Sequence, residues 1–141
     1  MNPVLKAKKL KKQFENYTVY DLIKYFGILL FEVNWDTGIG EYRYINRQQI
    51  IIVNTNLNDN LKQCVLWHEL GHALCHRTIN CYYMANKTRL RTIIYEVEAE
   101  QFAAEMLLPD KLDTELYGRT VQEIAAYYGV TTNLVEMKWG K

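Results

Sequence analysis

The sequence predicts an α+β fold in one domain of 141 residues. Two observations favour this fold class. Short segments rich in β-branched and aromatic residues come early, and from residue 58 onwards apolar residues recur with a helical period instead. No repeat, low-complexity tract or linker divides the chain. We expect four consecutive parts: N-terminal helices over 1–27, a sheet over 28–54, two long helices over 58–109 and C-terminal helices over 110–141.

The N-terminal part is predicted to form two short helices, over 5–17 and 18–26, which end at Gly27. We expect the lysines of the first helix to form a solvated face, with a contact surface for an acidic partner as the alternative. These lysines are Lys6, Lys8, Lys9, Lys11 and Lys12.

Three strands are expected next, over 28–35, 41–45 and 48–53. The turns between them are predicted at 38–40 and 46–47, and turns this short indicate a three-stranded antiparallel meander.

The second half of the chain is predicted to be helical, with a loop over 77–91. Asn58 or Asp59 can cap a helix that runs through Cys75. A second long helix is expected over 92–108, before Pro109. The last two helices are expected from Thr120, which opens a capping-box pattern, to Gly129, and after Thr132.

Composition is typical of a soluble globular protein, with 49% hydrophobic and 23% charged residues. The formal net charge of +1 does not favour a polyanionic partner such as nucleic acid. The sequence shows neither an apolar run long enough to cross a membrane nor a secretory signal. Its three cysteines match no disulfide framework, so we expect reduced thiols and a cytoplasmic protein.

The strongest chemical signal is His68-Glu69-Leu70-Gly71-His72, in the first long helix. Residues four apart project from one side of a helix, about 6 Å apart along its axis, so the two histidines can bind one metal ion. Glu69 then lies beside the metal, where it can take a proton from a water that zinc activates. Two core histidines are the alternative, but burying two imidazoles without partners is costly.

A catalytic zinc also needs a third protein ligand. His76 lies about 12 Å from His68 on a straight helix, which is too far for one ion. In metzincins the third histidine comes ten residues after the first, and that position is Thr78 here. We therefore expect His76 to be structural or to contact a ligand.

The third ligand is expected on the second long helix, whose apolar face includes Ala99 and Phe102. Glu96 and Glu98 flank this face on opposite sides, and Glu100 lies further toward solvent. Helical periodicity alone does not choose between Glu96 and Glu98.

Two blocks of the sequence together resemble the ImmA/IrrE family of metallopeptidases. They are His68-Glu69-Leu70-Gly71-His72-Ala73-Leu74-Cys75-His76 and Glu96-Val97-Glu98-Ala99-Glu100-Gln101-Phe102-Ala103-Ala104-Glu105-Met106-Leu107-Leu108-Pro109. The resemblance implies a compact glutamate-type zincin fold, a mini-gluzincin with a central His-Glu-x-x-His helix. It also implies one Zn²⁺ per chain, with Glu98 as the third ligand beside His68 and His72. At Glu100 the family usually has Asn or Asp.

The resemblance also implies a function. Family members occur in phages, other mobile elements and stress regulons, and are associated with cleavage of helix-turn-helix repressors. We therefore expect a regulatory zinc endopeptidase that cleaves a DNA-binding repressor in the cytoplasm, with Glu69 as general base. The alternative is a non-proteolytic antirepressor, or partner-binding module, in which zinc is structural; an intact Glu69 favours the enzyme.

Residues 120–139 also have the pattern of a helix-turn-helix unit. Few basic residues follow Arg119, so we expect packing or partner docking there and no direct binding of nucleic acid. The sequence does not identify the substrate, the oligomeric state or the residue that stabilises the oxyanion. Candidates for that last role are Tyr82, Tyr83, Tyr95 and Tyr117.

Overall fold

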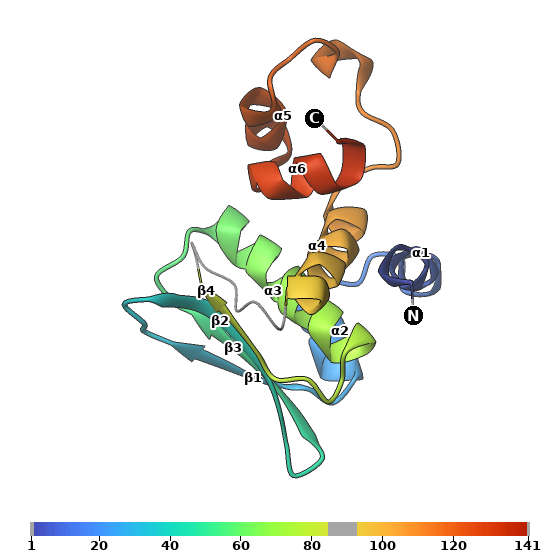
Figure 1. Cartoon of the computed structure of the whole chain (residues 1–141). Helices are drawn as coiled ribbons and strands as arrows, with labels where there is room; N and C mark the ends of the chain where they lie inside the picture. The colour runs from blue at the N-terminus through green and yellow to red at the C-terminus, as the bar shows by residue number, and fades with distance from the viewer. Residues whose placement is uncertain (1, 85–92, 141) are drawn as a thin grey trace.

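The computed structural model describes residues 2–84 and 93–140, and it combines one sheet with a set of helices (Figure 1). The chain is therefore α+β, as predicted. Its sheet has the strand order β1–β3–β2–β4. The strands are β1 (Leu29–Val33), β2 (Gly38–Ile45), β3 (Gln48–Asn54) and β4 (Cys81–Met84).

The sheet is mixed, which corrects the antiparallel meander expected from the sequence. β2 is antiparallel to both β3 and β4, but β1 runs parallel to β3, with Leu30 opposite Ile51. The run of apolar residues over 50–53 gives β3 apolar side chains on both faces, which suits the central position between β1 and β2. β4 lies where a loop over 77–91 was expected; the part of that loop over 85–92 is outside the described residues.

The predicted helices are present, with boundaries that differ by a few residues. Asn58 caps the first long helix by accepting a hydrogen bond from the N–H of Leu61 at 2.9 Å. Thr120 and Glu123 form the predicted capping box, and Gly129 ends that helix. The helices are α1 (Pro3–Gln13), α2 (Val19–Tyr25), α3 (Asp59–Cys75), α4 (Ile93–Leu107), the 3₁₀ turn η2 (Thr114–Leu116), α5 (Val121–Tyr128) and α6 (Thr132–Trp139).

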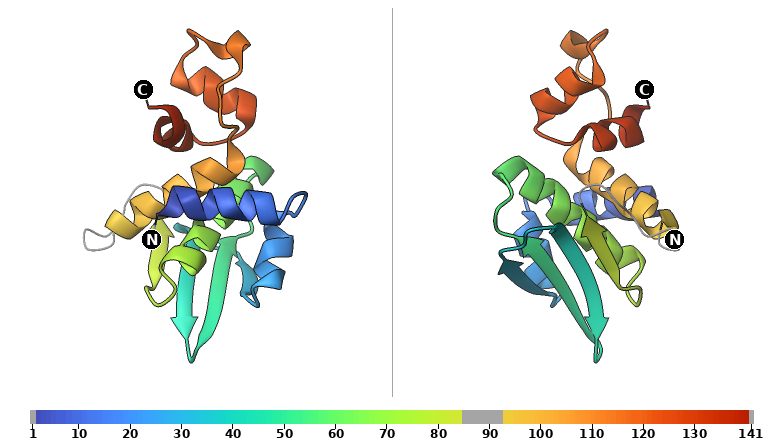
Figure 2. Two further views of the ribbon diagram at one scale, coloured as in Figure 1. Left: turned by 90° about the vertical axis from the view of Figure 1, so that its right-hand side faces the viewer. Right: turned by 60° about the vertical axis from the view of Figure 1, so that its left-hand side comes forward.

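The helices cover one face of the sheet, and α5 and α6 lie beyond the C-terminal end of α4, far from the strands (Figure 2). α3 packs directly on β2 and β3, and α4 packs on α3. Gly71 allows this close approach of α4, because a Cβ atom there would lie 3.1 Å from the Phe102 ring and 3.2 Å from the Ala99 carbonyl oxygen. α3 is therefore enclosed between the sheet and α4.

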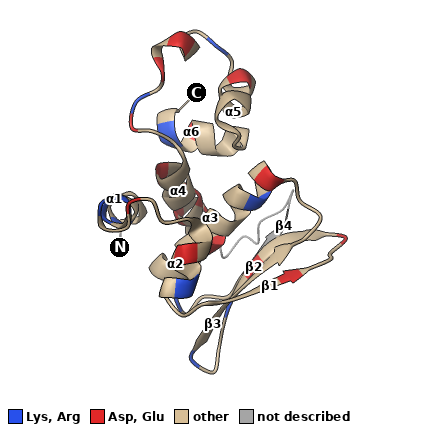
Figure 3. Cartoon of the chain, turned by 180° about the vertical axis from the view of Figure 1, so that it is seen from behind, with Lys and Arg blue, Asp and Glu red and all other residues tan. Residues whose placement is uncertain are grey.

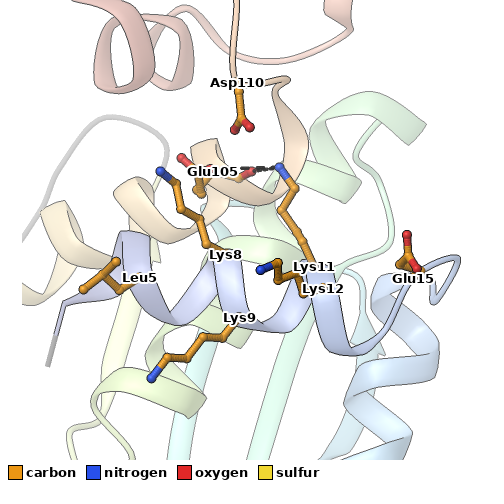
Figure 4. A pocket seen from close by; sticks show the side chains of 8 residues that line it. All are labelled: Leu5, Lys8, Lys9, Lys11, Lys12, Glu15, Glu105 and Asp110. Carbon is orange, nitrogen blue, oxygen red and sulfur yellow. Dashed lines mark hydrogen bonds and ion pairs between the residues drawn. The ribbon is translucent and has the colours of Figure 1, made fainter.

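The lysine-rich helix α1 lies beside α4 (Figures 3 and 4). Lys8, Lys9 and Lys12 are exposed, as expected for a solvated face. Lys11 instead donates a hydrogen bond to the carbonyl oxygen of Glu105, at 2.9 Å. The buried carboxylate of Glu105 accepts a hydrogen bond from a lysine of α6, Lys138. Glu105 therefore ties α1 and α6 to α4. Among the described residues, no helix combines the length and hydropathy that a membrane span requires.

Candidate metal centre

Helix α3 places its two histidines and the glutamate between them in the interior. The exposed fraction of His68, Glu69 and His72 is 0%. Every residue from Cys64 to Ala73 is buried, because this stretch has the sheet on one side and α4 on the other. His68, Glu69 and His72 are thus held together in the interior, where each side chain needs a hydrogen-bond partner, an opposite charge or a metal ion.

The partner of both histidines is a carboxylate from α4. The Nε2 atoms of His68 and His72 lie 3.2 Å apart. Glu96 places Oε1 at 2.8 Å from Nε2 of His68 and Oε2 at 3.0 Å from Nε2 of His72. One ligand atom from each of the three residues lies within 4.8 Å of the other two. Two imidazole nitrogens and one carboxylate oxygen are a donor set that zinc takes in catalytic sites.

A second glutamate of α4 orients His68 from the other side of its ring. Glu100 lies one helical turn after Glu96, and its Oε1 is 2.7 Å from Nδ1 of His68. Asn133 of α6 donates a hydrogen bond to the other carboxylate oxygen of Glu100. Glu100 was expected toward solvent but is buried. A carboxylate on Nδ1 directs Nε2 of a histidine toward a metal.

In the structure Glu98, the glutamate expected as third ligand, does not face His68 and His72. Residues two apart on a helix point in different directions, so Glu96 and Glu98 do not face the same histidines. Glu98 is 2.6 Å from Nε2 of His76, and its side chain is 34% exposed. Glu96 is the glutamate that faces His68 and His72.

Both carboxylate oxygens of Glu69 are buried without a hydrogen-bond partner among the described residues. Buried carboxylate oxygens in native proteins almost always have a partner. A cation held by His68, His72 and Glu96 would place positive charge beside the unpartnered carboxylate of Glu69. The residues present therefore fit a metal ion.

Comparison with known proteins agrees with this geometry. Residues 23–139 match the family of the IrrE N-terminal-like domain, peptidase M78. The chain belongs to the ImmA/IrrE family. Immunity region protein 2 of Bacillus phage phi105, itself uncharacterized, is 35% identical over 135 residues, which cover 94% of this chain and 85% of that protein. Metallopeptidase ImmA of Bacillus subtilis (strain 168) is 29% identical over 126 residues, which cover 86% of this chain and 73% of that protein.

Membership of a metallopeptidase family implies a metal ion, and the charges at this ImmA/IrrE site suit one. Burial lowers the pKa of His68, but hydrogen bonds with Glu100 and Glu96 prevail and raise it to about 10. Burial lowers the pKa of His72 to about 4, against the effect of Glu96. Burial raises the pKa of Glu96, but hydrogen bonds with both histidines prevail and lower it. The carboxylates thus stabilise positive charge between them.

Of the four tyrosines considered for stabilising the oxyanion, the structure describes the side chains of Tyr95 and Tyr117. The ring of Tyr95 packs against His76 at 4.8 Å between centroids, and Tyr117 is 67% exposed in the C-terminal part. The side chains of Tyr82 and Tyr83 lie outside the described residues. None of the four is assigned a role.

Sequence reasoning missed two residues of β2 that contact α3. Tyr42 is fully buried and stacks on His72, with ring centroids 6.4 Å apart. Gly40 lies against Glu69, since an added Cβ atom would be 2.6 Å from Oε2 of Glu69 and 2.6 Å from Cγ1 of Val65. The alternation of polar and apolar residues over 41–45 already indicated that Tyr42 points inward; nothing in the sequence indicated the contact of Gly40.

Gly40→Ala is expected to destabilise the protein by about 1–3 kcal/mol, the usual result of adding a methyl group to a filled interior. Gly40 does not have a positive φ, so the effect is steric and not due to backbone strain. Chemical unfolding measures it. The same substitution in a Glu69→Ala background should be milder, since one of the two colliding groups is gone. Equal stability of Gly40→Ala and wild type would contradict the close contact.

Proposed function

We propose that this protein is a zinc endopeptidase that binds one Zn²⁺ per chain through His68, His72 and Glu96. One observation carries the proposal: the buried carboxylate of Glu69 has no hydrogen-bond partner among the residues that the structure describes, and it lies beside three converging metal donors. Two neutral histidines and one carboxylate are the ligands of several zinc peptidases. The family match supports the same class of chemistry.

Different residues of the chain have different roles in the proposed peptide hydrolysis. A bound zinc ion supplies Lewis-acid activation of water and of the peptide carbonyl. Glu69 accepts the proton of the attacking water and passes it to the leaving amine. Burial raises the pKa of Glu69, which makes its carboxylate a better proton acceptor than an exposed one. Glu100, held by Asn133, keeps His68 oriented throughout.

The proposed substrate is a cytoplasmic helix-turn-helix repressor, whose cleavage lifts repression. The phage relative carries the name of an immunity region, and the bacterial relative is named as a metallopeptidase. The name of the phage relative supports a regulatory role in a phage or other mobile element, and that of the bacterial relative supports a peptidase. Direct binding of DNA by α5 and α6 is disfavoured, because Lys138 is engaged with Glu105 and Arg119 with Glu123. We propose that these helices serve packing or docking of the partner.

The second candidate function is a non-proteolytic antirepressor with a structural zinc. A pure binding module has no use for a fully buried carboxylate such as Glu69, which accepts no hydrogen bond from the described part of the chain, and holding one there is unfavourable. Glu69 therefore favours the enzyme.

Co-expression with a candidate helix-turn-helix repressor tests the proposed function. Wild type should shorten the repressor, and Glu69→Gln should leave it at full length. Immunoblotting against tags at both ends of the repressor measures its length, and an operator-binding assay measures its activity. A repressor that stays at full length yet loses DNA binding with both versions would establish the antirepressor instead.

A further inference from the structure

His72 has a partner on the side of its ring that faces away from Glu96. Nδ1 of His72 lies 3.3 Å from Nδ1 of His76, and Nε2 of His76 lies 2.6 Å from Oε1 of Glu98. The four groups thus form a line from Glu96, through two imidazoles, to Glu98. Glu96, His72 and His76 are buried, whereas the side chain of Glu98 is 34% exposed.

The C-terminal end of α3 and the first turns of α4 place His76 and Glu98 next to each other. His76 is the C-cap of α3, and its backbone N–H donates to the carbonyl oxygen of His72 at 2.7 Å, so its side chain lies one turn after that of His72. The ring of Tyr95, from α4, packs against the His76 ring, with centroids 4.8 Å apart. Glu98 comes from α4, nearly one turn after Tyr95. The imidazole of His76 is therefore held by contacts from both helices.

When Nε2 of His72 binds a metal, only one placement of the protons gives a donor and an acceptor to each hydrogen bond between His72, His76 and Glu98. That nitrogen then carries no proton, so a neutral His72 has its proton on Nδ1 and donates it toward His76. Nδ1 of His76 must accept, which places the proton of His76 on Nε2. Glu98, as a carboxylate, can only accept, and it receives that proton. Each group in the line thereby selects the tautomer of the next.

We propose that His76 and Glu98 are positioning residues, which hold His72 in the tautomer and orientation that present Nε2 to the metal. The inference rests on the proposed function in one respect, that Nε2 of His72 is a metal ligand. Glu100 and Asn133 act on His68 in the same way from the opposite end of the site. The role of Glu98 is thus to orient a ligand and not to bind the ion. Partners of this kind contribute about 10- to 100-fold to metal affinity.

The test measures metal binding and histidine tautomers, without an activity assay. Metal-free wild type, His76→Ala, Glu98→Ala and Glu98→Gln are titrated with Zn²⁺ against a chromophoric chelator. Long-range ¹⁵N–¹H spectra of the zinc-loaded proteins report which nitrogen of His72 bears the proton. The control is Val97→Ala, which alters an exposed neighbour of Glu98 on α4.

We expect His76→Ala and Glu98→Ala to bind zinc about tenfold or more weakly, with the His72 ring signals shifted from those of wild type. Glu98→Gln should bind nearly as wild type does, because its amide oxygen still accepts from His76. The partly exposed Glu98 can be replaced without opening the core, so its variants remain informative even if His76→Ala does not fold. Zinc binding and His72 signals like those of wild type in Glu98→Ala would overturn the positioning role and leave the proposed function standing. A wild type that binds no zinc would overturn both.

Discussion

Glu69→Gln is expected to lower the rate of peptide hydrolysis by about 10²- to 10⁴-fold, the usual contribution of a general base. Glutamine has nearly the same shape, but its amide cannot take a proton from water. Zinc content should stay at the wild-type level, because Glu69 is not among the three residues whose donor atoms converge. Stability should hold or rise, since a buried carboxyl group with no hydrogen-bond partner in residues 2–84 and 93–140, as far as these are described, is replaced by a neutral amide.

Three measurements on one preparation separate these effects. They are the cleavage rate of the repressor, the zinc content and the free energy of unfolding. Glu136→Gln, an exposed change of the same type on α6, is the matched control and should alter none of them. Cleavage at the wild-type rate by zinc-loaded Glu69→Gln would show that another group accepts the proton.

Local sequence signals predicted α3 and α5 well, because the residues that begin and end them act within one turn. Asn58 accepts from the N–H of Leu61, and Thr120 exchanges hydrogen bonds with Glu123. Strand pairing has no comparable local signal. The position of β1 beside β3 depends on which strand takes the centre of the sheet, and that is decided by burial across the whole domain.

In the candidate site, too, local sequence spacing predicted some residues, whereas others depend on contacts between distant parts of the chain. The spacing of His68 and His72 places both imidazoles on one side of α3 whatever lies around the helix. The choice between Glu96 and Glu98 depends instead on how α4 is rotated about its axis. That rotation follows from the contact of Gly71 with Phe102 and Ala99, two elements apart in the chain.

One signal in the sequence did favour Glu96. Glu96 and Glu100 are four residues apart, so a helix that turns one of them toward His68 also turns the other there. The structure shows this pair on the two nitrogens of the His68 ring. Glu98 has no carboxylate partner at that spacing on α4, and the resemblance alone pointed to it.

Glu96→Ala should therefore abolish stable zinc binding, whereas Glu98→Ala should only weaken it. Residues that orient a ligand contribute about 10- to 100-fold to affinity, so loss of the ligand itself should exceed about 100-fold. Removing Glu96 also takes away the carboxylate that faces Nε2 of both His68 and His72. Measured affinities should thus fall in the order wild type, Glu98→Ala, Glu96→Ala.

Zinc content after dialysis and chelator competition measure this order, with Val97→Ala as the common control. Co²⁺ in place of zinc adds a spectroscopic comparison, since its visible absorption reports the number of ligands. Loss of a ligand in Glu96→Ala should change that spectrum, and Glu98→Ala should keep the intensity of wild type. Full zinc occupancy in Glu96→Ala, together with loss in Glu98→Ala, would return the third ligand to Glu98. Because Glu98 faces His76 at 2.6 Å, that outcome would require α4 to turn about its axis when the metal binds.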